Sequence, residues 1–261
     1  MTIAWWTRAL RFAAAVALTL APGIAQARGT VVLTYDDALP SQLDHALPAL
    51  DAAGLKATFF LSGVREADVP RWRAAARRGH ELGNHTIFHP CAAAKFPADP
   101  RFTSEAYTPA TMLREIAQQN VLLRALDGRA RHGFATPCGE HLAGGQDYLE
   151  PLRAAKLVDY ARGVSMSDAE VRAGPTKVDA MHVPARGFGE NTTLAQLIAF
   201  AQEAEASGGW AVFLFHGIGG DYLSVDAAVH RAFVRWLRQH RRTIQVATLR
   251  DALTAALLGT A

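Results

Sequence analysis

The chain has 261 residues, half of them apolar, and its 27 basic against 24 acidic side chains give a formal net charge of +3. The apolar share suits a large buried core, and neither an internal repeat nor a low-complexity segment divides the chain. No basic run interleaved with aromatic residues occurs, so nucleic-acid binding is not expected.

The first 27 residues have the pattern of an export signal. Arg8 and Arg11 precede an apolar run at residues 12–21, and Ala-Gln-Ala at 25–27 offers a small-x-small cleavage site. A membrane span needs about 20 apolar residues, so no stable span is expected after cleavage. An uncleaved N-terminal anchor is the alternative. We therefore expect a signal peptide at 1–27 and an exported domain at 28–261, located in the periplasm or secreted.

Strands and helices are expected to alternate along the rest of the chain. Apolar, β-rich runs predict strands at residues 30–35, 56–63, 80–85, 132–137, 157–163, 177–185, 210–217 and 243–248. Helices are predicted at residues 41–54, 69–80, 108–128, 146–156, 192–209, 226–240 and 249–258. The helix at 108–128 has the clearest ends, with Thr108 as cap, Pro109 in the first turn and Gly128 as stop.

This alternation predicts a parallel α/β fold. About seven or eight strand-helix units in roughly 230 residues favour a (β/α) barrel over an open sheet. In such barrels, catalytic side chains come from the carboxyl ends of several strands. Functional residues are therefore expected directly after the apolar runs.

Five polar side chains meet that expectation. Asp36 and Asp37 end the first strand, His85 ends the third, His89 follows four residues later, and His216 follows the run at 210–215. Each has a simpler explanation alone, as a turn signal, a chance spacing or a core histidine. Together they form a candidate site, because one carboxylate and two imidazoles are a catalytic zinc set with open positions. The remaining carboxylate and histidine can act as base and acid.

Three segments resemble motifs of one known family. "TYDD" (34–37), "HTIFH" (85–89) and "FLFH" (213–216) look like motifs of the polysaccharide deacetylases, also called carbohydrate esterase family 4 or the NodB-homology domain. The resemblance covers roughly residues 29–250. It implies a single-domain, distorted (β/α) barrel of about seven parallel strands. It also implies removal of acetyl groups from an acetylated glycan with one divalent metal ion, most simply Zn²⁺, with Co²⁺, Ni²⁺ or Mn²⁺ as alternatives.

The resemblance also implies a role for each motif residue. Asp37, His85 and His89 would bind the metal ion. Asp36 would act as the general base and His216 as the general acid.

Further positions are expected near the acetyl group. Leu214 and Pro137 would line the pocket, and the backbone N–H of Tyr35 or of a neighbour would help to stabilise the oxyanion.

One motif departs from the family pattern. The third motif usually reads Arg-x-Pro, an aromatic residue and Gly, whereas "ATPCG" (135–139) has Ala135 in place of Arg and Cys138 in place of the aromatic residue. The expected partner of Asp36 is therefore missing, and an arginine from another strand end is expected to replace it. Arg162 and Arg186 both follow strand runs. Arg186 is favoured, because it lies in a loop bounded by Pro and Gly.

The fourth family motif is unclear, and Asp179 is a candidate partner for His216.

Cys91 and Cys138 are the two cysteines of the chain, and each lies just after a site motif. In an exported protein they predict a disulfide. Two free thiols, or an extra soft ligand for the metal ion, are the alternatives.

These observations favour a metal-dependent hydrolase that removes acetyl groups from an N-acetylated polysaccharide or oligosaccharide outside the cytoplasm. An O-acetyl esterase of the xylan type is the first alternative. A degenerate, non-catalytic saccharide-binding domain is the second. Retention of both Asp36 and His216 counts against the second, because a binding domain needs neither residue.

Overall fold

The computed structural model of the protein describes residue 1 and residues 28–96, 99–164 and 179–258. The predicted export signal lies at positions outside these ranges, apart from Met1. Within the described residues, no helix combines the length and the apolar character needed to cross a membrane.

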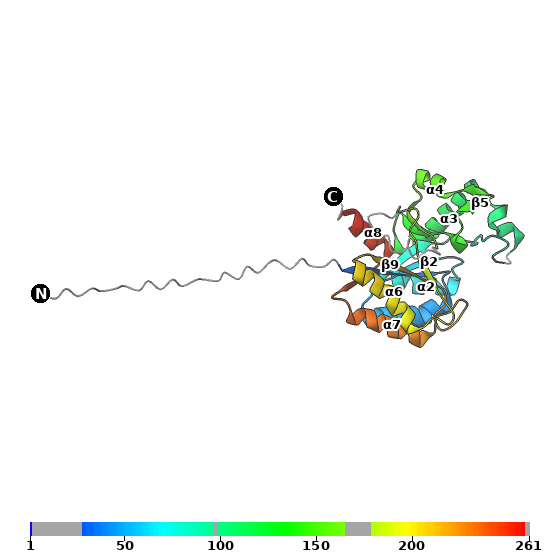
Figure 1. Cartoon of the computed structure of the whole chain (residues 1–261). Coiled ribbons are helices and arrows are strands. Elements are labelled where there is room, and N and C mark those ends of the chain that lie inside the picture. The colour runs from blue at the N-terminus through cyan, green and yellow to red at the C-terminus, as the bar shows by residue number, and fades with distance from the viewer. Residues whose placement is uncertain (2–27, 97–98, 165–178, 259–261) are drawn as a thin grey trace.

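Eight parallel strands form the main sheet, and helices alternate with them along the chain, as the sequence predicts (Figure 1). The strands are β1 (Gly29–Asp36), β2 (Thr58–Leu61), β3 (Glu81–Asn84), β4 (His132–Ala135), β7 (Val158–Arg162), β8 (Arg186–Phe188), β9 (Trp210–Phe215) and β10 (Ile244–Ala247). The α-helices are α1 (Leu47–Ala53), α2 (Val69–Arg77), α3 (Pro109–Asp127), α4 (Leu149–Ala155), α6 (Leu194–Ser207), α7 (Ala227–Gln239) and α8 (Leu249–Leu258).

Short elements fill the connections, and the sequence analysis predicted none of them. They are the π-helical turn η1 (Gln42–Ala46), the 3-10 turns η2 (Glu66–Asp68), η3 (Pro100–Phe102), η4 (Ser104–Ala106) and η5 (Pro137–Gly139), and the antiparallel pair β5 (Leu142–Ala143) and β6 (Gln146–Asp147). The turn η1 takes up the first part of the helix expected at 41–54.

The strands follow the order β7-β4-β3-β2-β1-β9-β8. One edge of β1 is shared, because β10 pairs with Gly29–Val32 and β2 pairs with Thr34–Asp36. The seven strands of this path form the distorted, curled barrel that the sequence and the family resemblance predict.

An irregular segment closes the barrel between β7 and β9. The Ala161 N–H donates to the Ala180 carbonyl at 2.8 Å, the Val183 N–H donates to the Ala161 carbonyl at 3.0 Å, and β8 pairs with β9 a few residues later. The strand expected at 177–185 is therefore misplaced, because the described part of that segment makes only the single bridge from Val183 to Arg162. Pro184 has no N–H to extend a ladder, and the regular strand begins at Arg186.

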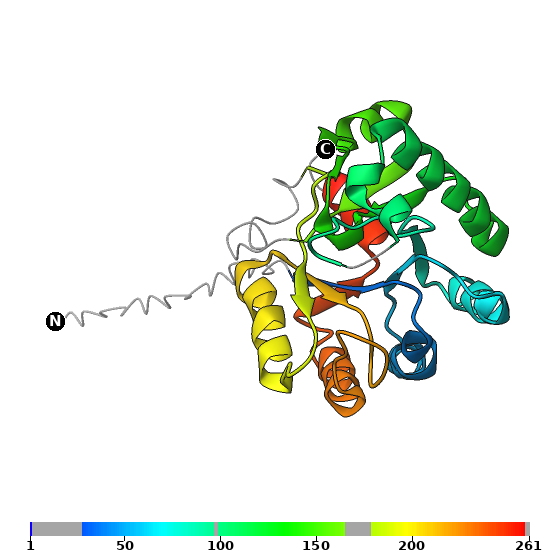
Figure 2. The same ribbon diagram turned by 90° about the vertical axis from the view of Figure 1, so that its right-hand side faces the viewer.

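Side chains of β1 alternate between two hydrophobic clusters. Val31, Leu33 and Tyr35 of β1 belong to the outer core, which α1, α2, α6 and α7 cover. Figure 2 shows these helices following one another around the outside of the sheet. Val32 points to the opposite side, into the barrel, where Leu249 of α8 packs against it in the same cluster. Residues of α8 therefore pack with the strand side chains that face the barrel interior.

A buried carboxylate connects α8 to three strands. Glu81 accepts hydrogen bonds from the Thr58 hydroxyl (2.9 Å), the Tyr160 hydroxyl (2.8 Å) and the Arg250 N–H (3.1 Å). The Arg250 guanidinium lies 3.2 Å from the other Glu81 oxygen and balances its charge. Because both oxygens of Glu81 have partners, its burial is compensated.

We predict that Glu81→Ala lowers the free energy of unfolding by about 3–5 kcal/mol. The substitution leaves the Thr58 and Tyr160 hydroxyls without their acceptor, and it leaves the half-buried Arg250 guanidinium with only Asp159, 3.8 Å away, as a counter-charge. Urea unfolding of the wild type and the variant measures this loss. The matched control is Glu66→Ala at an exposed position, which should change stability by less than about 0.5 kcal/mol. Equal stability of the two variants would contradict the structural role of Glu81.

Candidate functional site

The end of β1 turns so that both aspartates reach the same space. Asp37 and Ala38 have positive φ angles of 78° and 55°, and the Asp37 N–H donates to the Phe60 carbonyl at 3.1 Å. Neighbouring residues of a regular strand point to opposite faces, and this left-handed turn removes that constraint. Such a backbone costs roughly 1–2 kcal/mol per residue, a form of strain that is common at functional sites.

Side chains fix the tight turn that carries the two histidines. Thr86 and His89 have positive φ angles of 61° and 53°. The Thr86 N–H donates to the Asn84 side chain at 2.9 Å, and the His89 N–H donates to the Thr86 hydroxyl at 3.0 Å. Glu115 of α3 accepts the N–H groups of residues 87 and 88, both at 2.8 Å. The turn is therefore held in place before any ligand binds.

Asp37, His85 and His89 present three ligand atoms to one point. Asp37 Oδ1 lies 3.3 Å from His85 Nε2 and 3.4 Å from His89 Nε2, and the two imidazole nitrogens are 3.0 Å apart. Oδ1 is buried and has no hydrogen-bond partner. The Nδ1–H of His85 donates to the Ala135 carbonyl at 2.9 Å, which leaves Nε2 free to bind a cation. This donor set fits a divalent metal ion such as zinc.

Charges within the cluster suit a cation. Burial opposes ionisation of Asp37, but the adjacent imidazole of His85, with the charges of His89 and His216, holds the pKa of Asp37 well below its usual range. Burial also opposes protonation of His85, yet Asp36 and Asp37 outweigh it and raise the pKa of His85. Burial and the charge of His85 lower the pKa of His89 to about 4. A divalent ion at this position would compete with protonation of His85.

Asp36 pairs with Arg162. Both side chains are buried, and Arg162 Nη2 donates to Asp36 Oδ1. The other oxygen of Asp36, Oδ2, lies 3.7 Å from His85 Nε2 and faces the ligand cluster. The prediction that Arg186 is the partner of Asp36 is wrong. Arg186 instead places its guanidinium 4.7 Å from the centre of the Phe200 ring of α6.

His216 lies at the end of β9 beside the ligand cluster. Its Nε2 is 3.8 Å from Asp37 Oδ2, and its side chain keeps 20% exposure, so a substrate can reach it. Leu214 is buried in the inner cluster, two residues earlier on the same face of β9. Gln42 of η1 donates its side-chain amide to the carbonyls of both Asp36 and His216, which ties the ends of β1 and β9 together.

Three further residues were predicted to act at the site, namely Tyr35, Pro137 and Asp179. The Tyr35 side chain points into the outer core, where its hydroxyl hydrogen-bonds His230 Nε2 at 2.7 Å, and its backbone lies inside the paired part of β1. Pro137 is buried at the start of η5, just after β4. Asp179 forms an ion pair with Arg153 of α4 at 2.5 Å. That pairing does not support Asp179 as the partner of His216.

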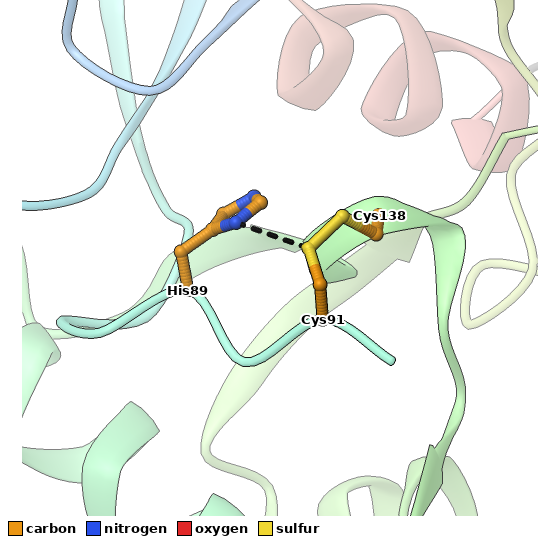
Figure 3. A group of neighbouring side chains, drawn as sticks. All are labelled: His89, Cys91 and Cys138. Carbon is orange, nitrogen blue, oxygen red and sulfur yellow. Dashed lines mark hydrogen bonds between the residues drawn. A yellow bond between two sulfur atoms is a disulfide. The ribbon is translucent and has the colours of Figure 1, made fainter. Parts of the chain in front are cut away.

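A disulfide joins the two loops beside the site. Cys91 and Cys138 are bonded and lie 47 positions apart in the sequence, and Figure 3 shows His89 next to them. His89 Nδ1 lies 3.4 Å from Cys91 Sγ. A disulfide sulfur can only accept, so this contact places the proton on Nδ1 and leaves Nε2 for a ligand. In the chain-entropy model a loop of this length stabilises the fold by about 4 kcal/mol.

Sequence reasoning missed three side chains that shape the site. Gln42 and Glu115 act through backbone groups, as described above. Tyr222, in the loop after His216, donates its hydroxyl to Asp37 Oδ2 at 2.8 Å. No motif marked these residues, because their roles depend on contacts between segments far apart in the sequence.

Comparisons with known proteins identify the family and the fold. The sequence model of a family described as polysaccharide deacetylase matches residues 24–153. A solved Mycobacterium smegmatis protein, described as a polysaccharide deacetylase, aligns with a TM-score of 0.63 at 18% identity, covering 90% of this chain and 92% of that one. A search of curated proteins found no significant match.

Two further solved structures share the fold. The catalytic domain of a peptidoglycan N-acetylglucosamine deacetylase from Eubacterium rectale aligns with a TM-score of 0.57 at 17% identity, covering 90% of this chain and 93% of that one. A family 4 acetyl xylan esterase from Clostridium thermocellum, solved with a cobalt ion, aligns with a TM-score of 0.51 at 20% identity, covering 87% and 91%. At these identities the likeness shows a common fold.

We predict that the purified protein carries one divalent ion and that His85→Ala loses it. Removing a direct ligand should weaken binding by more than the roughly 10- to 100-fold that loss of an outer-shell partner costs. Elemental analysis after gel filtration measures the metal content. The control His182→Ala removes an exposed imidazole and should keep the ion. Equal metal content in the two variants would rule out the assigned ligand set.

Proposed function

The chain belongs to the polysaccharide deacetylase family, and we propose that it releases acetate from an N-acetylated polysaccharide or oligosaccharide outside the cytoplasm. The observation that carries this proposal is that one site holds a metal-ligand set, a carboxylate paired with arginine, and a partly exposed histidine. We assign the ion to Asp37, His85 and His89, with Zn²⁺ as the first candidate.

When bound, the ion would polarise the acetyl carbonyl and lower the pKa of water at the site. Asp36 takes the proton from the attacking water. Arg162 engages Asp36 Oδ1 and leaves Oδ2 facing the ligand cluster, so the base is oriented before the substrate arrives. Arg162 also supplies the positive charge that the third family motif lacks at Ala135.

His216 completes the reaction by donating a proton to the departing sugar nitrogen. The imidazole of His216 lies next to Asp37 at the edge of the ligand cluster, and its side chain is partly exposed, so a substrate can contact it. The amide of Gln42, which binds the carbonyls of residues 36 and 216, keeps base and acid at a fixed separation. Leu214 supplies an apolar surface for the acetyl methyl group.

Two observations support an exported enzyme. The N-terminal 27 residues have the pattern of a signal peptide, and the disulfide is typical of proteins that fold in an oxidising compartment. The periplasm or the cell exterior is therefore the proposed location.

The site residues bear on the two alternative functions differently. An O-acetyl esterase would use the same residues, because an alkoxide leaving group also needs a proton. A saccharide-binding domain without catalysis would need neither the pair of Asp36 with Arg162 nor His216, so their presence together supports catalysis.

We expect the mature protein to release acetate from chitin oligomers or peptidoglycan, and a chelator to abolish the release. Acetylxylan, tested in parallel, separates ester from amide hydrolysis, and release from acetylxylan alone would favour the esterase.

Asp36→Asn should keep the metal ion and lower kcat by about 10²- to 10⁴-fold, because it removes a base and no ligand. The control Asp251→Asn changes an exposed carboxylate and should retain activity.

The corrected arginine assignment makes a separate prediction. Arg162→Met should lower kcat/KM strongly and destabilise the fold by about 3–5 kcal/mol, because the buried Asp36 carboxylate loses its counter-charge. Arg186→Met serves as the matched variant, since Arg162 ends β7 and Arg186 begins β8, the two strands on either side of the closing segment. Its kcat/KM should stay near that of the wild type. A larger loss in Arg186→Met than in Arg162→Met would reverse the assignment.

A further inference from the structure

We propose that Tyr222 is a positioning residue of the metal centre and that its ring is a contact surface for the sugar. Its hydroxyl orients the Asp37 carboxylate toward the ion, and its exposed ring face lies where a pyranose would approach His216. This inference rests on the proposed function for the substrate. The role of Tyr222 in metal binding rests only on the geometry around Asp37 and does not depend on which substrate is used.

The two oxygens of Asp37 have different surroundings. Oδ1 is buried without a hydrogen-bond donor and faces the Nε2 atoms of His85 and His89. Oδ2 accepts the Tyr222 hydroxyl at 2.8 Å. The Tyr222 contact therefore fixes the rotation of the carboxylate and presents Oδ1 to the cation. Partners of this kind typically change metal affinity by about 10- to 100-fold.

The loop that carries Tyr222 is held by its own backbone. The Gly217 N–H donates to the Tyr222 carbonyl at 3.1 Å, the Val225 N–H donates to the Gly217 carbonyl at 3.0 Å, and the Gly219 N–H donates to the Val225 carbonyl at 2.8 Å. A Cβ at Gly217 would lie 2.1 Å from the Gly220 carbonyl oxygen, so only glycine fits there. The glycines after His216 thus permit a compact loop that returns Tyr222 to the site.

A second set of contacts ties this loop to the segment after β1. The Ser41 N–H donates to Asp221 Oδ2 at 2.9 Å, and the Ile218 N–H donates to the Ser41 hydroxyl at 3.0 Å. Asp221 and Leu223, on either side of Tyr222, have positive φ angles of 62° and 46°. Two left-handed residues around one side chain are costly, and such strain persists where the surroundings impose it. Here it directs Tyr222 toward Asp37.

The ring of Tyr222 remains accessible. The residue is 50% exposed, and its ring centre lies 6.2 Å from that of His216, the proposed acid. An exposed aromatic face beside the proton donor is a suitable surface for the apolar C–H face of a pyranose. The hydroxyl and the ring therefore have separable tasks, one directed at the metal ion and the other at the glycan.

The test separates these two tasks. Apparent Co²⁺ and Zn²⁺ dissociation constants are measured by competition with a chromophoric chelator for wild type, Tyr222→Phe, Tyr222→Ala and Leu223→Ala. Loss of the hydroxyl should weaken metal binding by about 10- to 100-fold in both Tyr222 variants. Leu223→Ala is the matched control, because it changes an exposed neighbour with the same left-handed backbone and should bind as tightly as wild type. Thermal melts of each apo-protein check that the loop change has not unfolded the chain.

At saturating metal, KM for a chitin oligomer tests the ring. Tyr222→Ala should have a KM about 2- to 10-fold above that of Tyr222→Phe, which keeps the aromatic face. Wild-type metal affinity in Tyr222→Phe would overturn the positioning role, as would an equal loss in Leu223→Ala. Equal KM values for Phe and Ala would overturn the sugar contact. If the wild type binds metal but releases no acetate from any glycan, the proposed function fails while the affinity comparison still decides the role of Tyr222.

Discussion

A buried ion pair across the barrel interior, between Asp36 of β1 and Arg162 of β7, is the constraint on which the site depends. In the strand order, β4, β3 and β2 lie between β7 and β1, so the pair joins opposite walls. Burying either charge alone would cost several kcal/mol, and the pair is tolerated because each compensates the other. The ring of Phe60 lies 4.9 Å below the guanidinium and adds a favourable contact. A barrel that closed in another register would leave both charges without a partner.

The proposed metal-ligand set of Asp37, His85 and His89 depends on a different constraint, which is local. Asp37, Thr86 and His89 all adopt left-handed backbone conformations, and side chains from α3 and β3 hold the histidine turn by accepting its N–H groups. Backbone N–H groups that are bound in this way cannot rearrange cheaply when the ligand is absent. The cost of bringing two imidazoles and a carboxylate together is thus met during folding, and binding of an ion need not order the site.

Much of this arrangement follows from sequence patterns with simple physical causes. Apolar runs mark the buried strands, and the ends of α3 are set by a Thr108 capping box and a left-handed Gly128, as predicted. Because parallel strands end at one side of the barrel, residues 36, 37, 85, 89 and 216 could be grouped before any contact was known. The pairing of the two cysteines followed from the same grouping, since both lie in loops at that side.

The remaining features depend on which face a short strand presents. Arg162 shares a face of β7 with Tyr160, which lies in the inner cluster, whereas Arg186 shares a face of β8 with Phe188, which packs on the outer core. The alternation of a strand shows that residues two apart share a face, but it does not show which face points inward. The sequence therefore could not decide which of the two arginines is the partner of Asp36. Tyr222 was beyond reach for another reason, because its position depends on a glycine-bearing loop whose path is set by contacts with Ser41 and Asp37.

The pairing of β1 with β9 and β10 has a consequence for how the chain folds. The first strand of the domain is completed by the last two, which lie about 180 to 215 positions later in the sequence. Contacts of such long sequence separation slow folding, because the chain loses the entropy of loop closure before the strand contacts that stabilise the sheet have formed. The central strand thus stays unpaired on one side until nearly the whole polypeptide is available.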